Sequence, residues 1–387
     1  MKFLHTGDLH LGKTVNDFSM MEDQRFILRQ IVEKAREEKA DAVVISGDIY
    51  DRAIPPAEAV TLLDDFLTRL VELAIPVLLI SGNHDSPERI GFAEDILQQK
   101  GVWIAGIYRD RLKKVTFSDS YGEVTFVLMP FVKPSAVDAK TSGEAVEKLL
   151  REEKLAREEA LQPENRKTGG RFVLVTHFFV TDQGREPEIS DGETSVHVGG
   201  LDNVEASLFR DFDYVALGHI HKPQKIGSGP VYYAGAPLAY SFSEAGHTKY
   251  MNLVELGRKG DCLVSQIPFK PLHEMRKIKG NLKDLMREDV ADAADRNDYI
   301  QAVLTNKEEL IDPVGTLRLV YPNLMQLILE KNEQTGKEAY ESRLTERKKS
   351  IAELFNGFYE LVREAGPDEE RERVIAQAAE EAQEGQI

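Results

Sequence analysis

Short apolar runs that end in acidic, amide or imidazole side chains most constrain the fold of this chain. Five such runs occur, at residues 2–10, 41–51, 75–85, 171–179 and 213–221. Segments of helical length and periodicity, 20–39 and 57–74, separate the first three runs. Strands that alternate with helices of this size predict βαβ units around buried sheets. After the third run, Ser86 and Pro87 predict a helix start, as N-cap and first helical residue.

The side chains at the ends of the runs are all potential metal ligands or acid–base groups. They are Asp8, His10, Asp48, Asp51, Asn83, His84, Asp85, His177, His219 and His221. Open α/β sheets bind ligands at the carboxyl ends of their strands, so we expect these side chains in one site. Carboxylate, amide and imidazole groups without thiolates suit Mn, Fe or Zn, and Asp48 is well placed to bridge two ions.

The last run ends in two histidines, His219 and His221, with Ile220 between them. On an extended strand, residues two positions apart point to the same face. The spacing therefore predicts that the two histidines point to the same side, where both can serve one site, while Ile220 faces the core.

Bulk composition narrows the class of protein. The 387 residues, 42% of them hydrophobic and 30% charged, are typical of a globular protein of two or three domains. A single cysteine, Cys262, rules out an internal disulfide and favours a reducing compartment. Since no signal peptide or membrane span is evident, we expect a cytoplasmic protein without membrane contact. The net charge of −17 argues against broad electrostatic attraction to nucleic acid.

Each motif alone also has an ordinary structural explanation. Asp-x-His and Gly-Asp after a strand are common turns or helix starts, and a lone histidine such as His177 is more often a core or surface residue. The four histidines outside the motifs are expected to be ordinary strand, loop or surface residues, although the loop of His197 could border the site. These are His5, His197, His247 and His273.

The combination of motifs resembles the signature of the calcineurin-like metallophosphoesterases. The pattern D-x-H, G-D-x-x-D, G-N-H-D, H and G-H-x-H occurs in that order across residues 8–221. Stretches such as TGDLHLGK, SGNHDSPERIGF, ALGHIHKPQ and YAGAPLAYSFSE resemble the branch of SbcD-type DNA nuclease subunits, bacterial counterparts of the meiotic-recombination-eleven nuclease. The resemblance implies an α/β fold, a four-layer αββα metallophosphoesterase sandwich, with a small α+β capping domain and C-terminal helices.

A change in sequence character near residues 265–275 supports a domain boundary there. We expect a metallophosphoesterase (nuclease) domain at 1–268, a capping domain at 269–335, and C-terminal helices with an acidic tail at 336–387. An amphipathic stripe from Leu344 to Val362 is either an exposed charged helix or a docking surface for a partner.

The resemblance also implies roles for single residues. One metal ion would be held by Asp8, His10, Asp48 and His221, and the other by Asp48, Asn83, His177 and His219. His84 would contact the scissile phosphate and assist the leaving group, with Asp85 orienting it. Archaeal and eukaryotic relatives have a second catalytic histidine where this chain has Asp51, so Asp51 is expected to hold a loop or His84 in position.

The implied function is that of a Mn²⁺-dependent nuclease subunit, a 3′-to-5′ exonuclease on double-stranded DNA and an endonuclease on single strands and hairpins. Two bound ions, Mn²⁺ by the family's preference, would activate the attacking water. The implied partners are DNA, an SbcC-type coiled-coil ATPase that binds the C-terminal helices, and a second copy of the chain joined through the nuclease domain. The implied setting is DNA repair, recombination and replication at the nucleoid.

Two other hypotheses stay open on the sequence alone. A metallophosphatase or phosphodiesterase with a non-DNA substrate would share the G-D-x-x-D-R motif, but Ala53 and Asp85 stand where protein phosphatases carry Gly and Glu. A non-catalytic scaffold of the same fold is the third hypothesis, although a binding module has no need for seven metal ligands.

Overall fold

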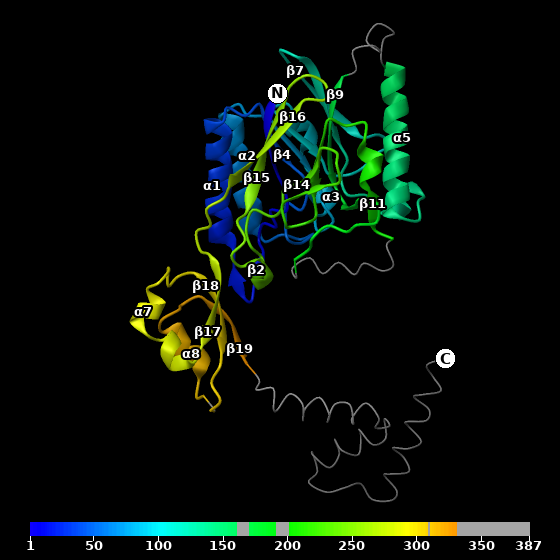
Figure 1. The fold of residues 1–387 in the computed structure, drawn as a ribbon. Coiled ribbons are helices and arrows are strands. Elements are labelled where there is room, and N and C mark those ends of the chain that lie inside the picture. Colours follow the sequence, from blue (N-terminus) through cyan, green and yellow to red (C-terminus); the bar gives the residue numbers. More distant parts are fainter. Residues whose placement is uncertain (161–169, 191–200, 309, 331–387) are drawn as a thin grey trace, which may run out of the picture.

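The structure is a computed structural model that describes residues 1–160, 170–190, 201–308 and 310–330. The predicted C-terminal helices at 336–387 and the loop histidine His197 lie outside these residues. Two six-stranded sheets form the body of the described chain, and a smaller domain lies at one end of it (Figure 1).

The first sheet carries the three N-terminal apolar runs. Its strands are, in spatial order, β16 (Cys262–Pro268), β15 (Tyr250–Leu256), β1 (Lys2–Thr6), β4 (Ala42–Ile45), β5 (Val77–Ile80) and β6 (Val102–Ala105). Strands β1, β4, β5 and β6 run parallel to one another. Strand β15 pairs antiparallel with β1, and β16 pairs antiparallel with β15. Helices α1 (Met21–Glu37) and α2 (Ala57–Glu72) form crossovers, as the periodicity predicts.

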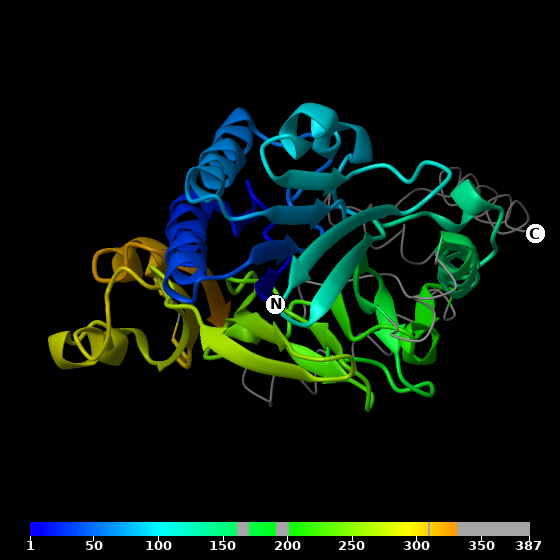
Figure 2. The ribbon, with the colours of Figure 1, turned by 90° about the horizontal axis from the view of Figure 1, so that it is seen from above.

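The second sheet carries the two later runs. Its strands are, in spatial order, β13 (Gln224–Ile226), β14 (Val231–Tyr233), β12 (Tyr214–Gly218), β9 (Arg171–His177), β8 (Gly122–Leu128) and β7 (Lys113–Asp119). Its four central strands are parallel, with an antiparallel neighbour at each edge. Helix α5 (Ser142–Ala160) covers its outer face (Figure 2).

The two sheets pack face to face between helices on both sides (Figure 2). Apolar side chains from both sheets form the inner core, among them Phe3, Val44, Phe126, Val175 and Tyr214. Two further clusters fill the spaces between each sheet and its helices. Because β4 and β5 are buried on both faces, their sequences AVVI and VLLI are continuously apolar. The expected four-layer αββα sandwich is confirmed.

The small domain has a parallel sheet of three strands, β17 (Met275–Gly280), β18 (Tyr299–Leu304) and β19 (Leu324–Leu329). Short helices lie in its crossovers: α6 (Leu282–Leu285), α7 (Glu288–Ala291) and α8 (Pro313–Arg318). Strands that alternate with helices make this domain α/β, which differs from the expected α+β arrangement. The domain has its own core and lies near the N-terminal end of α1 (Figure 1).

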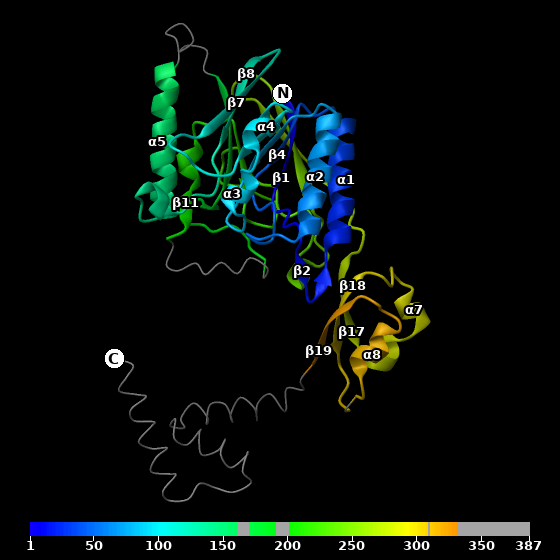
Figure 3. The same ribbon diagram turned by 180° about the vertical axis from the view of Figure 1, so that it is seen from behind.

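Shorter elements frame the rest of the body. The hairpin β2 (Thr14–Val15) and β3 (Phe18–Ser19) precedes α1, and β10 (Phe179–Thr181) pairs with β11 (Asn203–Glu205). Helix α3 (Pro87–Ile90) starts at the predicted cap, where the Ser86 hydroxyl accepts from the Arg89 amide, and α4 (Glu94–Gln98) follows it (Figure 3). Within the described residues, short 3₁₀ helices span Pro134–Val137, Ala206–Phe209 and Phe242–Glu244. No helix among the described residues is long and apolar enough to cross a bilayer.

Candidate metal centre

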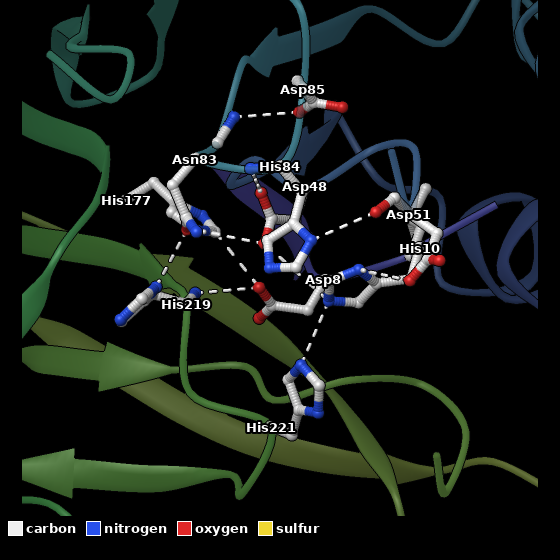
Figure 4. A network of polar contacts seen from close by, with 12 residues as sticks. Asp8, His10, Asp48, Asp51, Asn83, His84, Asp85, His177, His219 and His221 are labelled. Carbon is white, nitrogen blue, oxygen red and sulfur yellow. Dashed lines mark hydrogen bonds and ion pairs between the residues drawn. The ribbon is translucent and has the colours of Figure 1, made fainter. Parts of the chain in front are cut away.

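The polar side chains that follow the five apolar runs meet at one place, at the carboxyl ends of strands from both sheets (Figure 4). Strands β1, β4 and β5 of the first sheet lead to the N-terminal candidates, and β9 and β12 of the second sheet lead to the remaining histidines. All ten predicted site residues are in this cluster.

Glycines let the chain segments that follow the strands approach closely enough to share one site. A methyl group at Gly218, which ends β12, would overlap the carbonyl oxygen of Ser46 and lie 2.7 Å from Nδ1 of His177. A methyl group at Gly82 would overlap the carboxylate of Asp48. Only a residue without Cβ fits where two backbones come this close.

Asp48 lies at the centre of the cluster and is buried. Its Oδ2 is 3.4 Å from Nε2 of His177, 3.7 Å from Nε2 of His10 and 4.0 Å from Nε2 of His84. Its Oδ1 accepts a hydrogen bond from the amide of His84 at 3.0 Å. Asp48 thus faces imidazoles from both sheets, as expected of a bridging carboxylate.

The other donor atoms gather in two groups around Asp48. Nε2 of His10 and Nε2 of His221 are 3.0 Å apart. On the other side, Oδ1 of Asn83 lies 2.9 Å from Nε2 of His177 and 3.0 Å from Nδ1 of His219. His221 therefore lies beside His10, and His219 lies beside Asn83 and on the same side as His177.

Asp8 lies between the two groups. Its Oδ1 accepts a hydrogen bond from the amide of His219 at 2.8 Å and lies 4.0 Å from Nδ1 of His177. Potential ligand atoms of Asp8, Asp48 and His177 lie within 4.8 Å of one another, and the same holds for His10, Asp48 and His84. Asp8 thus lies close to a histidine of the second sheet, while the sequence motifs assign it to the ion of His10.

Histidines 219 and 221 lie beyond the strand that leads to them. Strand β12 ends at Gly218, and His219 has a φ of 105°, so the expected extended conformation of this pair is wrong. The turn sends His219 toward Asn83 and His221 toward His10. Ile220 is buried in the core beneath the second sheet, as predicted.

Four residues of the cluster have left-handed backbone conformations. Asp8, His10, Asp48 and His219 have φ values of 51°, 45°, 48° and 105°. Each such conformation costs a non-glycine residue about 1–3 kcal/mol and persists only where the surroundings enforce it. Strain concentrated on potential ligands is typical of a functional site.

Burial and mutual contact shift the pKa values of the cluster. Burial opposes charge on both Asp48 and His177, yet their attraction lowers the pKa of Asp48 and raises that of His177 to about 9. Burial lowers the pKa of His10 to about 3, against the opposing effect of Asp48. The pKa of His221 also falls well below its usual value through burial and the nearby His10. His10 and His221 are hence neutral, the form in which imidazole binds metal ions.

Asp85 is expected to orient His84, and in the structure its carboxylate binds backbone amides of the loops around the cluster. Its carboxylate accepts three amide hydrogen bonds, from Ile49 at 3.0 Å, Tyr50 at 2.9 Å and Gly82 at 2.9 Å. Asp85 therefore fixes the turn that carries Asp48. Burial and the charge of Asp48 raise the pKa of Asp85 to about 6, although the amide hydrogen bonds oppose this.

Asp51 supplies the contact that orients His84. Nδ1 of His84 lies 3.1 Å from the carbonyl oxygen of Asp51, and the imidazole is 44% exposed. The Asp51 carboxylate accepts a hydrogen bond from Nζ of Lys13 at 2.6 Å and lies 3.6 Å from Nδ1 of His10. Both roles agree with the expectation that Asp51 holds a loop or His84 in place.

The residues present fit a pair of divalent ions. The donors are carboxylate, amide and imidazole groups, which suit octahedral Mn²⁺ or Fe²⁺ and also Zn²⁺. The described chain places two groups of such atoms around one shared carboxylate, and strained backbone holds four of the residues. A cluster of this kind without a cation would bury several imidazoles and acids at a net cost.

Sequence reasoning missed the side chains that support this cluster. Tyr240 and Gln24 are buried and hydrogen-bond the backbone of the loop that carries His10. Lys249 donates to the carbonyl oxygen of His221 at 3.0 Å and pairs with Glu244. Tyr240 and Glu244 lie in the YAGAPLAYSFSE stretch that resembles SbcD-type subunits, which was the one available signal.

The histidines expected to be ordinary differ in their roles. His5 is buried between Tyr214 and Ser46, and burial lowers its pKa to about 3. His247 is exposed, whereas His273 contacts the buried carboxylate of Asp23.

Comparison with known proteins gives two family matches. The sequence profile of the calcineurin-like phosphoesterases matches residues 1–223, and that of the Type 5 capsule protein repressor C-terminal domain matches residues 271–363. The SbcD subunit of nuclease SbcCD from Staphylococcus epidermidis is 32% identical over 328 residues, which cover 84% of this chain and 85% of that protein.

Two solved structures resemble the chain more distantly. One is a crystal structure of a Thermus thermophilus protein with a TM-score of 0.40, 13% identity, and coverage of 68% of this chain and 98% of that one. The other is a dimetal phosphatase from Danio rerio with a TM-score of 0.41, 14% identity, and coverage of 69% and 95%.

Proposed function

Because the chain belongs to the calcineurin-like phosphoesterases and, within them, to the SbcD-type nuclease subunits, we propose that it hydrolyses phosphodiester bonds of DNA as the nuclease subunit of an SbcCD-type complex. We further propose that it acts as a 3′-to-5′ exonuclease on double strands and as an endonuclease on single strands and hairpins. The observation that carries the proposal is the pair of ligand groups that share Asp48.

The proposed ligands divide as the sequence motifs suggest. Asp8, His10, Asp48 and His221 would hold one ion, and Asp48, Asn83, His177 and His219 the other. The ions proposed are Mn²⁺, which such oxygen and imidazole donors accommodate. When bound, two such ions neutralise phosphate charge and make a water acidic enough to attack.

His84 is proposed as the proton donor to the leaving oxygen. Its Nδ1 donates to the Asp51 carbonyl, which fixes the ring with Nε2 on the side of Asp48. The imidazole of His84 is 44% exposed and can contact a substrate, whereas the carboxylate of Asp48 is buried and cannot. Asp85 acts indirectly, by fixing the turn that presents Asp48 and His84.

DNA binding by a chain of net charge −17 requires local positive charge. Two divalent ions would add four charges at the site. Arg52, whose side chain is 78% exposed, follows Asp51 at the rim of the cluster and is a candidate to contact a flanking phosphate.

The nuclease activity is tested with purified protein and Mn²⁺ on linear DNA, hairpin DNA and an aryl phosphate monoester. Wild type should cut both DNAs, and His84→Ala should lose cleavage while it still binds Mn²⁺. Cleavage of the monoester alone would indicate a phosphatase, and no Mn²⁺-dependent cleavage of any substrate would indicate a scaffold.

We propose the domain division 1–268, 269–335 and 336–387, with the last part docking onto an SbcC-type coiled-coil ATPase. The profile match at 271–363 includes the stripe from Leu344 to Val362 and supports a common role for this region. Deletion of 336–387 should abolish co-purification with the ATPase and leave Mn²⁺ binding intact. Retention of the complex would rule out this docking role.

A homodimer through the nuclease domain is also proposed. Large apolar side chains are exposed at and just before the start of α2 and around α3 and α4, which lie near one another in Figure 3. They are Ile54, Val60, Phe92 and Ile96, with exposed fractions of 74%, 47%, 79% and 68%. Apolar surface of this kind marks interaction sites. Phe92→Asp should convert a dimer to a monomer in sedimentation analysis, whereas Leu263→Asp, at a 64% exposed position on β16, should not.

A further inference from the structure

Two consecutive polar side chains in the first turn of α1 are almost fully buried. Asp23 is 0% exposed and Gln24 is 2% exposed. Burying a carboxylate or an amide costs free energy unless its polar atoms are hydrogen-bonded. The partners of these two side chains therefore indicate what the first turn of α1 does.

Gln24 holds the loop that presents His10. Its Oε1 accepts from the amide of Gly12 at 3.0 Å, and its Nε2 donates to the carbonyl of His10 at 2.7 Å. The same Nε2 lies 3.2 Å from the hydroxyl of Tyr240, which donates to the carbonyl of Leu9 at 2.5 Å. These bonds hold the backbone of the loop in which His10 has its left-handed conformation.

Asp23 holds the small domain. Its carboxylate accepts from the hydroxyl of Tyr299, the first residue of β18, at 2.6 Å. It also accepts from the amide of His273, just before β17, at 3.1 Å, and lies 3.2 Å from Nδ1 of the same residue.

A second pair of hydrogen bonds to the same region starts from Gln30, two turns further along the same helix. The side chain of Gln30 donates to the carbonyl of Lys270 at 2.7 Å and accepts from the amide of Lys270 at 3.0 Å. Asp23 and Gln30 are seven residues apart and so lie on the same face of α1. This face thus fixes the segment that joins the body to the small domain.

Apolar packing closes the same junction. Met275, Tyr299 and Met325 of the small domain belong to the core cluster that contains Leu9 and Met20 of the body. The ring of Tyr299 also meets that of Phe18 in β3, edge to face, with centroids 6.2 Å apart. The apolar core between the body and the small domain is therefore continuous with the core that packs against the loop carrying His10.

We propose that the first turn of α1 couples the small domain to the metal centre, with Gln24 as a positioning residue for His10 and Asp23 as the anchor of the small domain. Because the two residues are consecutive in a rigid helix, a shift of one displaces the other. The inference rests on the proposed function in one respect, since it takes His10 as a metal ligand.

Full-length variants test the coupling. Gln24→Met keeps the side-chain length and removes the hydrogen bonds to the loop, whereas Tyr299→Phe removes only the hydroxyl that contacts Asp23. Tyr321→Phe is the matched control, because Tyr321 is buried in the small domain's own core and donates to the carbonyl of Leu285 at 2.9 Å. The readouts are Mn²⁺ affinity by calorimetry and amide hydrogen exchange of residues 8–13 in metal-free protein.

We expect Gln24→Met to weaken Mn²⁺ binding roughly tenfold, the scale for residues that orient ligands. Tyr299→Phe should weaken it several-fold and speed exchange in 8–13, and Tyr321→Phe should change neither. The coupling is overturned if Tyr299→Phe matches wild type in both readouts, or if both tyrosine variants change them equally. Absence of Mn²⁺ binding by wild type would refute the proposed function, while hydrogen exchange would still decide the coupling.

Discussion

His84 and Asp85 are adjacent in the sequence, yet the atoms that hold them differ. His84 depends on a backbone carbonyl, that of Asp51, which a substitution of the Asp51 side chain leaves in place. Asp85 depends on its own carboxylate, which accepts from three amides at once. Substitutions at the two acids should therefore differ in effect.

Asp85→Asn should lower DNA cleavage with Mn²⁺ by roughly 10–100-fold. The asparagine side chain has an NH₂ donor in place of one carboxylate oxygen, and this donor would face backbone N–H groups that also donate. Asp51→Ala should cost less than about tenfold, because the His84 contact survives and the main loss is the pair with Lys13. Steady-state cleavage rates of both variants check this. A larger loss in Asp51→Ala than in Asp85→Asn would show that the Asp51 side chain has a more direct role.

The gathering of these residues in one place could be predicted from sequence, but their contacts could not. The same ligand chemistry recurs after five strands, and parallel strands bring such residues to one edge. Whether Asp85 bonds to His84 or to the amides of Ile49, Tyr50 and Gly82 depends on the path of the loops, which has no periodic signal. The role of Gln24 could not be predicted, because a sequence does not distinguish a glutamine on the buried face of a helix from an exposed one.

Among the elements, β4 and β12 approach each other closely just beyond their carboxyl ends. They belong to different sheets and meet where Gly218 faces Ser46. The separation of the two sheets at this edge, and hence the distance between His177 and Asp48, depends on the absence of a side chain there.

Gly218→Ala should therefore lower both the stability and the Mn²⁺ affinity of the protein. Overpacking of this kind costs about 1–3 kcal/mol. Gly229→Ala is the control, since a methyl group there would have only an ordinary contact with Val231, 3.7 Å away. Thermal unfolding and calorimetric Mn²⁺ titration check both variants. If Gly218→Ala melts and binds Mn²⁺ like Gly229→Ala, the close approach of the strands is not required.

Local elements were easier to predict than their assembly. The lengths and periodicity of 20–39 and 57–74 predicted α1 and α2 to within two residues at each C-terminal end. The pairing of β1 with β15, which joins residues some 250 positions apart, has no local signal. The parallel order of β17, β18 and β19 was missed because the intervening helices are too short to show a period.

For the whole molecule, a polar cluster joins the two sheets at the opposite end from the metal centre. Strand β9 begins at Arg171 and ends at His177. The buried guanidinium of Arg171 pairs with Asp119 of β7 and donates to the carbonyl of Gly257, after β15, at 2.8 Å. Arg171 thus links the second sheet to the first.

Asp119→Asn should destabilise the protein at neutral pH by about 2 kcal/mol, the scale of a charge-assisted hydrogen bond. Arg171 lowers the pKa of Asp119, so the stabilisation is present above the unfolded-state pKa of about 4 and is lost as the pH falls toward the lower folded-state value. Urea unfolding of wild type and variant at pH 7 and pH 3 measures this. The difference in the free energy of unfolding should shrink at pH 3, and an undiminished difference would contradict the assignment.

The most direct test of the metal centre is the number and coupling of bound ions. Mn²⁺ titration of purified, metal-free protein, followed by electron paramagnetic resonance, should give two ions per chain with a spin-coupled spectrum, because Asp48 lies between both ligand groups. Asp48→Asn should lose the coupling. One ion per chain, or two magnetically independent ions in wild type, would contradict a centre bridged by Asp48.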